Sequence, residues 1–103
     1  MLDHLGYRVI IAEDGNKAVE IYQQRYKEID MVVLDMIMPG ISGLETYNRL
    51  KNINPKIKVL LSSGYSEKGQ ASEIIARDKQ DFIQKPFDLA HLSQKVTNIL
   101  VTP

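Results

Sequence analysis

The sequence has no cysteine among its 103 residues, no long apolar run and no excess of charge of either sign. Without cysteine, disulfide bonds and thiolate metal sites are excluded. No apolar segment approaches the roughly 20 residues that a membrane-spanning helix needs, and the N-terminus lacks the basic and apolar regions of a secretory signal. Thirteen basic residues balance thirteen acidic ones, so no net charge favours nucleic acid or an anionic membrane. We therefore expect a cytoplasmic protein that binds neither directly.

The composition and the alternation of segments predict one α/β domain over residues 1–103. Hydrophobic residues make up 44% and charged residues 25% of the chain, which is typical of a globular domain, and the length suits one core. Strand-like runs rich in Val, Ile and Leu lie at 7–12, 30–35, 57–62 and 81–84. Helix-like segments with one apolar face follow them, at 16–26, 43–54, 70–77 and 89–99. Such alternation favours a parallel sheet with helices on both faces.

Two helix starts carry capping signals. Ser42 and Glu45 form the pattern of a capping box, in which the serine hydroxyl accepts a backbone hydrogen bond from the residue three positions later. Asp88 has the side chain of an N-cap for the last helix. We expect that helix to turn an apolar stripe toward the core, made of Leu89, Leu92, Val96 and Ile99.

Polar residues stand at the ends of three of the apolar runs. Asp35 ends one run, Ser63 follows another and Lys85 follows a third. In an open parallel sheet the carboxyl ends of the strands form one shared edge, where ligands bind. A carboxylate, a hydroxyl and an ammonium at this edge predict a site that holds a phosphoryl group on Asp35. Ser62 is a register alternative to Ser63, and the glycine at position 64 favours Ser63.

Three segments together carry a resemblance to a known family. VLDMIMPG at 33–40, SG at 63–64 and FIQKPF at 82–87, in this order, resemble the receiver domains of two-component response regulators. The segment LSSGYS at 61–66 is similar to receivers attached to hybrid sensor kinases. The resemblance implies a flavodoxin-like (CheY-like) fold, a doubly wound parallel sheet in three layers. It implies a signalling switch that promotes its own phosphorylation and is not an enzyme acting on a separate metabolite.

The resemblance also implies roles for single residues. Asp35 corresponds to the phosphoacceptor, Lys85 to a point charge beside it and Ser63 to a hydroxyl donor toward the phosphate. Phe82 corresponds to an aromatic side chain that changes rotamer on phosphorylation, although a plain core position is the alternative. A cis peptide is expected at Pro86. Mg²⁺ is the implied cofactor, with Asp35 and the backbone carbonyl of Ile37 among its ligands.

The implied partner is a histidine kinase or a phosphotransfer domain, and the implied output is a switched protein-interaction surface. The rival interpretation is a pseudo-receiver, an interaction module that has lost phosphotransfer. A small flavin or hydrolase enzyme of similar fold is disfavoured, because no Gly-rich strand-to-helix turn is present to hold a phosphate.

One feature of the family is missing from the sequence. The family begins with a central strand, in the sheet order 2-1-3-4-5, which ends in two acidic residues. Residues 1–5 instead match the tail of the following helix, so we expect an N-terminally truncated receiver with an empty slot between the strands at 7–12 and 30–35. Glu13 and Asp14 are not expected to replace the pair, because they follow a different strand. These absences predict weak Mg²⁺ binding and poor phosphorylation. A homodimer or a strand-swapped assembly is one way in which the missing strand would be supplied.

Overall fold

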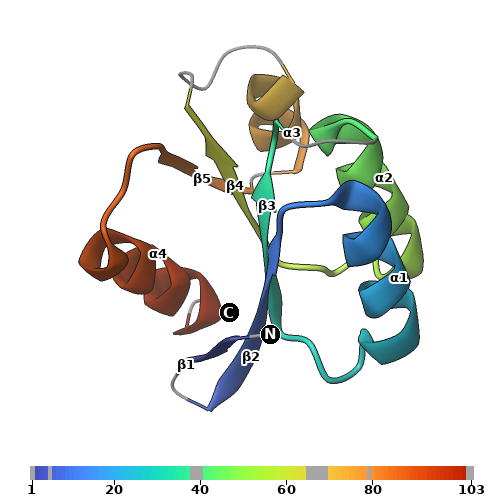
Figure 1. The fold of residues 1–103 in the computed structure, drawn as a ribbon, viewed down its shortest axis with the longest axis horizontal. Coiled ribbons are helices and arrows are strands. Elements are labelled where there is room, and N and C mark those ends of the chain that lie inside the picture. Colours follow the sequence, from blue (N-terminus) through green and yellow to red (C-terminus); the bar gives the residue numbers. More distant parts are fainter. Residues whose placement is uncertain (1, 5, 38–40, 65–69, 79, 102–103) are drawn as a thin grey trace.

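The computed structural model describes residues 2–4, 6–37, 41–64, 70–78 and 80–101. In this part of the chain one sheet has the strand order β1-β2-β3-β4-β5. Figure 1 shows α1, α2 and α3 against one face of the sheet and α4 against the other. The elements are β1 (Leu2–His4), β2 (Tyr7–Ala12), α1 (Gly15–Arg25), β3 (Met31–Asp35), α2 (Gly43–Ile53), β4 (Val59–Ser63), α3 (Gln70–Asp78), β5 (Asp81–Gln84) and α4 (Leu89–Val101). The predicted three-layer α/β architecture is confirmed.

The N-terminal segment differs from the sequence prediction. Residues 2–4 form the strand β1, which pairs antiparallel with β2 in the register Leu2↔Val9. The prediction of a helix tail at 1–5 is therefore wrong for the residues that the structure describes. Gly6 lies between the two strands with φ of 83°, a backbone conformation that favours glycine. This glycine allows the chain to reverse, so that a short polar segment becomes the outer strand of a hairpin.

The strands β2 and β3 are direct neighbours. They pair in parallel from Val9↔Met31 to Ala12↔Leu34, and β3 and β4 pair in the same sense. The prediction of an empty slot between these strands is therefore wrong. Unpaired backbone groups inside a sheet are costly, and direct pairing satisfies them. With β2 and β3 paired directly, there is no open position between them for a strand from a second chain.

Both helix N-caps predicted from the sequence are present in the structure. Ser42 Oγ accepts a hydrogen bond from the Glu45 amide at 3.1 Å, and Asp88 Oδ1 accepts one from the His91 amide at 2.7 Å.

The apolar stripe predicted for α4 is wrong at its first position, because Leu89 is 77% exposed. The buried residues are spaced four apart, at Leu92, Val96 and Leu100, so the helix meets the sheet only after its first turn. In the described part of the chain, none of the helices combines the length and the hydrophobicity that crossing a bilayer requires.

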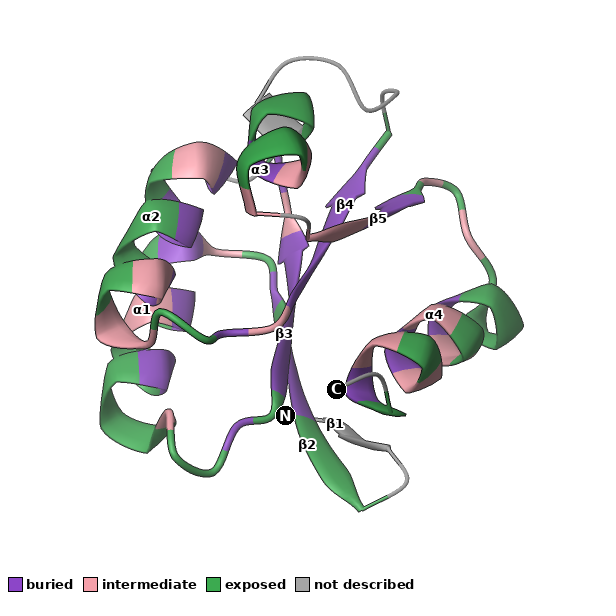
Figure 2. Cartoon of the chain, turned by 180° about the vertical axis from the view of Figure 1, so that it is seen from behind, coloured by how far each residue is buried: buried purple, intermediate pink, exposed green. Residues whose placement is uncertain are grey.

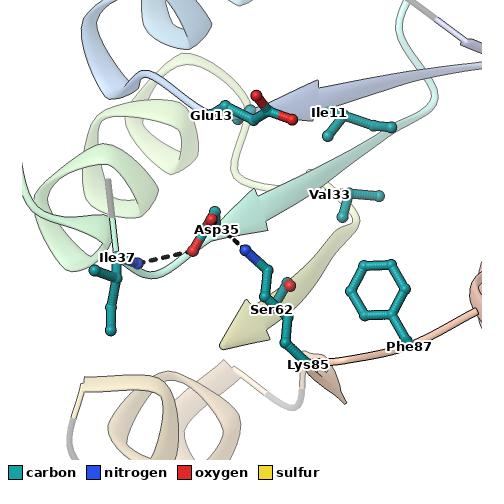
Figure 3. A pocket seen from close by; sticks show the side chains of 9 residues that line it. Ile11, Glu13, Val33, Asp35, Ile37, Ser62, Lys85 and Phe87 are labelled. Carbon is teal, nitrogen blue, oxygen red and sulfur yellow. Dashed lines mark hydrogen bonds and ion pairs between the residues drawn. The ribbon is translucent and has the colours of Figure 1, made fainter. Parts of the chain in front are cut away.

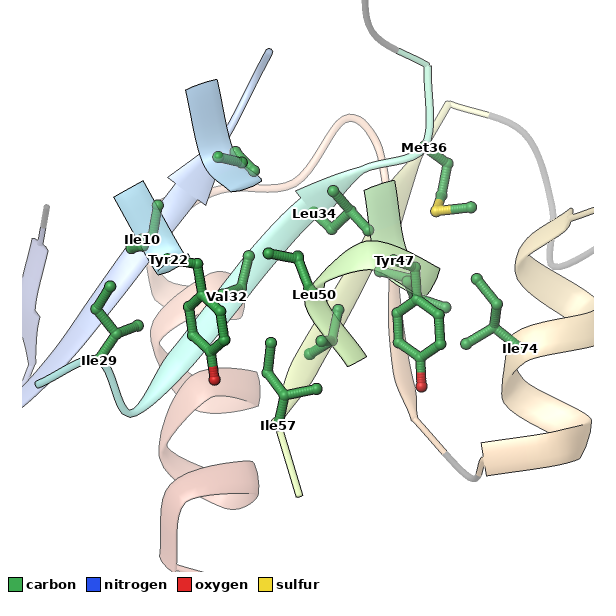
Figure 4. Close-up of a cluster of buried hydrophobic side chains, with 14 of the residues drawn as sticks. Ile10, Tyr22, Ile29, Val32, Leu34, Met36, Tyr47, Leu50, Ile57 and Ile74 are labelled. Atoms are coloured by element: carbon green, nitrogen blue, oxygen red, sulfur yellow. The ribbon is translucent and has the colours of Figure 1, made fainter. Parts of the chain in front are cut away.

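The sheet separates two hydrophobic clusters in the part of the chain that the structure describes. The larger one fills the space under α1, α2 and α3 and includes Tyr22, Leu50 and Ile74 (Figure 4). The smaller one lies between the sheet and α4. Figure 2 shows buried residues along the central strands and exposed ones on the outer helix surfaces. β3 is buried on both faces up to its last residue and β4 along its whole length, as is typical of the inner strands of a parallel sheet.

A polar network fastens α2 to α3 beside the larger cluster. Tyr47 Oη donates a hydrogen bond to Asp78 Oδ2 at 2.7 Å, and Lys51 Nζ lies 3.1 Å from Asp78 Oδ1. Burial and the neighbouring Asp78 carboxylate raise the pKa of Tyr47 to about 12. Desolvation acts to raise the pKa of Asp78, but hydrogen bonds from Tyr47, Lys51 and Arg77 outweigh it, and the pKa is lowered.

This network predicts a pH-dependent contribution to stability. Because the pKa of Asp78 is lower in the folded chain than the ordinary value of 3.8, its charged form stabilises the fold above pH 3.8, and the contribution is lost as the pH falls through the lower, folded pKa. Asp78→Asn should lower the free energy of unfolding by on the order of 1 kcal/mol at pH 7. Urea denaturation should show this difference shrinking below about pH 4. Glu20→Gln, on the exposed side of α1, is the control, and a pH-independent difference for Asp78→Asn would contradict the assignment.

Candidate functional site

A pocket of about 430 Å³ opens at the carboxyl ends of the parallel strands. Among the described residues its lining comes from the ends of β2, β3 and β4 and from the segment after β5 (Figure 3). The lining residues are Ile11, Ala12, Glu13, Val33, Asp35, Ile37, Ser62, Lys85 and Phe87. This is the edge at which the sequence predicts a site.

Asp35 lies at the centre of this arrangement. It is the last residue of β3, and its side chain is 20% exposed. The Ile37 amide donates a hydrogen bond to Asp35 Oδ1 at 3.0 Å, and Lys85 Nζ donates one to Oδ2 at 2.5 Å. The first contact holds the carboxylate against the following loop, and the second places the Lys85 ammonium directly beside it (Figure 3).

Lys85 reaches Asp35 from two strands away. It follows β5 directly, and its peptide bond to Pro86 is cis, as the resemblance implies. The Lys85 amide donates a hydrogen bond to the Ser63 carbonyl at 2.8 Å, which holds the start of this turn against β4. The side chain then crosses the end of β4, where it remains 41% exposed. The structure thus brings Asp35 and Lys85 together.

The two serines at the end of β4 differ in position. Asp35 pairs with Ser62, whereas Ser63 pairs with Gln84. Successive side chains of a strand point to opposite faces, so Ser62 shares the face of Asp35 and lines the pocket. Ser62 is 2% exposed, and within the described part of the chain its hydroxyl has no hydrogen-bond partner. Ser63, which the sequence favours for the hydroxyl role, is buried beside it and contributes its carbonyl to Lys85.

Phe82 lies away from the pocket. It pairs with Leu61 and belongs to the larger hydrophobic cluster, on the side of α3. Its rotamer change therefore stays a prediction, and its observed position is that of a core aromatic residue. Ile37 lies at the pocket, 60% exposed, with its backbone turned toward Asp35 through the amide contact.

Glu13 lines the pocket, which the sequence does not predict. The expectation that Glu13 does not replace the acidic pair assumes that another strand lies between β2 and β3. In the structure Ala12 pairs with Leu34, so Glu13 follows the strand next to Asp35. Asp14 instead accepts a hydrogen bond from the Lys17 amide at 3.2 Å and caps α1. Only the pairing of the strands, which no local pattern reveals, could have identified Glu13.

The donor atoms of the pocket fit a hard cation. No group of three His, Cys, Asp or Glu side chains gathers anywhere in the described residues. The pocket nevertheless has two carboxylates, from Asp35 and Glu13, and the unpartnered hydroxyl of Ser62. Mg²⁺ prefers oxygen ligands and is commonly held by one or two carboxylates and several waters. The residues present therefore fit such an ion, with few protein ligands.

Sequence comparisons point to one family. A sequence model described as the response regulator receiver domain matches residues 1–97. A cyclic di-GMP phosphodiesterase of Thermotoga maritima is 35% identical over 95 residues, which are 92% of this chain and 25% of that protein. The sensor kinase CckA of Brucella abortus is 36% identical over 99 residues, 96% of this chain and 10% of that protein. The chain thus spans a quarter or less of the length of these relatives.

Solved structures agree with this result. CheY of Borrelia burgdorferi, in its complex with CheX, BeF₃ and Mg²⁺, superposes with a TM-score of 0.82 at 24% identity, covering 93% of this chain and 90% of that one. This likeness shows the fold. The receiver domain of NtrX from Brucella abortus has a TM-score of 0.76 at 29% identity, covering 89% of this chain and 77% of that one.

The unpartnered hydroxyl of Ser62 leads to a test of stability. A buried hydroxyl without a partner is unfavourable, so Ser62→Ala should leave the free energy of unfolding unchanged or raise it by up to about 1 kcal/mol. Ser42→Ala is the matched control, because it removes an N-cap and should cost about 1 kcal/mol. Chemical denaturation without added metal or phosphate measures both. A loss at Ser62 as large as the loss at Ser42 would show that the hydroxyl has a partner within the protein.

Proposed function

Since the chain belongs to the family of response regulator receiver domains of two-component signalling, we propose that it accepts a phosphoryl group on Asp35. The donor is a phosphohistidine of a partner histidine kinase or phosphotransfer domain. The observation that carries this proposal is the contact between Lys85 Nζ and Asp35 Oδ2 at 2.5 Å, in an open pocket at the carboxyl edge of the sheet. We further propose that residues 1–103 act as one receiver domain in the cytoplasm.

The chemistry requires a carboxylate that can approach phosphorus in line. An oxygen of Asp35 forms a bond to phosphorus while the bond from phosphorus to the histidine nitrogen breaks, and the imidazole leaves with that electron pair. The product is an acyl phosphate. Such transfers depend mainly on positioning and on charge stabilisation. Here the Ile37 amide orients one carboxylate oxygen, and the Lys85 ammonium lies where negative charge gathers on the transferred group.

A divalent cation has a place in this proposal. Receiver domains generally bind Mg²⁺, and when bound it adds positive charge beside the phosphoryl oxygens. Asp35 and the backbone carbonyl of Ile37 are the ligands implied by the family. Ser62 and Ser63, at the end of β4, are the hydroxyl groups from which a donor to the phosphoryl group would come. Ser63 is the one implied by the family, and Ser62 is the one that lines the pocket.

We propose that phosphorylation changes a protein-interaction surface made by α3, β5 and α4. Phe82 of β5 is 8% exposed and belongs to the same hydrophobic cluster as Ile74 of α3. A change in the rotamer of Phe82 would therefore repack α3 against the sheet. Because Lys85 follows β5 directly, movement of the Lys85 side chain toward a phosphoryl group would also shift the end of β5.

Phosphorylation with a small phosphoryl donor tests the proposal. Wild-type protein incubated with acetyl phosphate and Mg²⁺ should gain one phosphoryl group by intact-protein mass, and hydroxylamine should remove it because the bond is an acyl phosphate. Asp35→Asn should gain none. Lys85→Met should be labelled on the order of 100-fold more slowly, because it loses the charge that stabilises the transferred group.

Asp30→Asn is the matched control. Asp30 accepts a hydrogen bond from the Arg8 amide at 2.8 Å and does not line the pocket, so this variant should be labelled like wild type. Label that persists in Asp35→Asn would place the acceptor elsewhere. Absence of label from wild type would favour an interaction module without phosphotransfer.

A further inference from the structure

We propose that Glu13 is a ligand of a divalent cation, which it holds together with Asp35 at the carboxyl edge of the sheet. This inference deepens the proposed function and rests on it for the use of the site, since the cation would lie beside the phosphoryl group on Asp35.

Strand order places the two carboxylates side by side. Parallel pairing of Ala12 with Leu34 puts positions 13 and 35 next to each other in register, at the ends of strands about 4.8 Å apart. Both side chains line the same pocket. Figure 3 shows Glu13 at the end of β2 and Lys85 reaching Asp35 from the other direction. Asp35 therefore has the end of β2, with Glu13, on one side and the Lys85 ammonium on the other.

The charged side chains that line the pocket have a net negative charge, which a cation would neutralise. Asp35 and Glu13 bring two negative charges to the pocket lining, and Lys85 brings one positive charge. The ion pair of Lys85 is with Asp35 Oδ2, and neither Lys85 nor another residue has a described ion pair with Glu13. Two carboxylates that share one site repel each other, and a divalent cation between them removes this repulsion. A cation is therefore favoured on the β2 side of Asp35.

The buried hydroxyl of Ser62 independently points to an occupant of the pocket. Its oxygen has no hydrogen-bond partner within the described residues, although Ser62 is 2% exposed and lines the pocket beside Asp35. Buried polar side chains are nearly always hydrogen-bonded to protein or ordered water. A hydrated cation on Asp35, or an oxygen of the phosphoryl group, supplies the missing partner.

The chemistry of these groups selects the class of ion. All the available side-chain donors are oxygens, and no cluster of three His, Cys, Asp or Glu is present in the described ranges. A hard ion that keeps several of its waters, such as Mg²⁺ or Mn²⁺, suits two carboxylates. With few protein ligands the site should be weak, and the loss of one carboxylate should be easily measured.

Titration with Mn²⁺ alone tests this inference without any phosphoryl donor. Electron paramagnetic resonance of free Mn²⁺ gives the dissociation constant for the wild type, Glu13→Gln and Asp35→Asn. Glu13→Gln should raise that constant by about tenfold or more. Glu20→Gln makes the same chemical change on the exposed side of α1, outside the pocket, and should bind like wild type. In wild type, Mn²⁺ should broaden the amide signals of Glu13 and Ile37 first.

Two results would overturn the inference. One is a Glu13→Gln variant that binds Mn²⁺ like wild type, and the other is a wild type with no Mn²⁺ bound near Asp35. Phosphotransfer itself is measured separately, by the mass of the intact protein after incubation with acetyl phosphate. If wild type binds Mn²⁺ through Glu13 but gains no phosphoryl group, the proposed function fails and the cation site stands.

Discussion

The parallel pairing of β2 with β3 is the constraint on which the site depends. It satisfies the backbone groups of both strands from Val9↔Met31 to Ala12↔Leu34 and leaves no gap in the sheet. As a consequence the carboxyl edge presents side chains in a fixed order across four strands, namely Glu13, Asp35, Ser62 and Lys85. A different neighbour for β3 on this side would put a different side chain beside Asp35, so the position of Glu13 follows from this one ladder of hydrogen bonds.

Stability and chemistry come from different parts of the molecule. The residues buried on both sides of the sheet supply the hydrophobic free energy, and the Asp78 network ties α2 to α3. The Lys85–Asp35 pair is partly exposed on both sides, 41% and 20%, and such pairs add little to stability. In the proposed function its value is chemical, because the Lys85 ammonium already lies beside the carboxylate that would accept the phosphoryl group.

The sequence predicts local structure well and neighbouring strands poorly. The strands at 7–12 and 81–84 and the caps at Ser42 and Asp88 agree with the structure, because periodicity and capping are local properties. The polar strand ends at Asp35 and Lys85, which the sequence singles out, both line the pocket at the carboxyl edge of the sheet. The hairpin at residues 2–4, the position of Glu13 and the register that puts Ser62 opposite Asp35 were not predictable. Each depends on which strands pair, and that depends on contacts between distant segments.

The most direct test of the account is therefore the pairing of β2 with β3 in solution. Nuclear Overhauser effects between backbone protons report such neighbours, and the account predicts cross-strand contacts between Ile10 and Val32 and between Ala12 and Leu34. Slow exchange of the amides in this ladder should accompany them. A spectrum in which β3 contacts β4 but shows no contact with β2 would contradict the account, because Glu13 would then have no reason to lie beside Asp35.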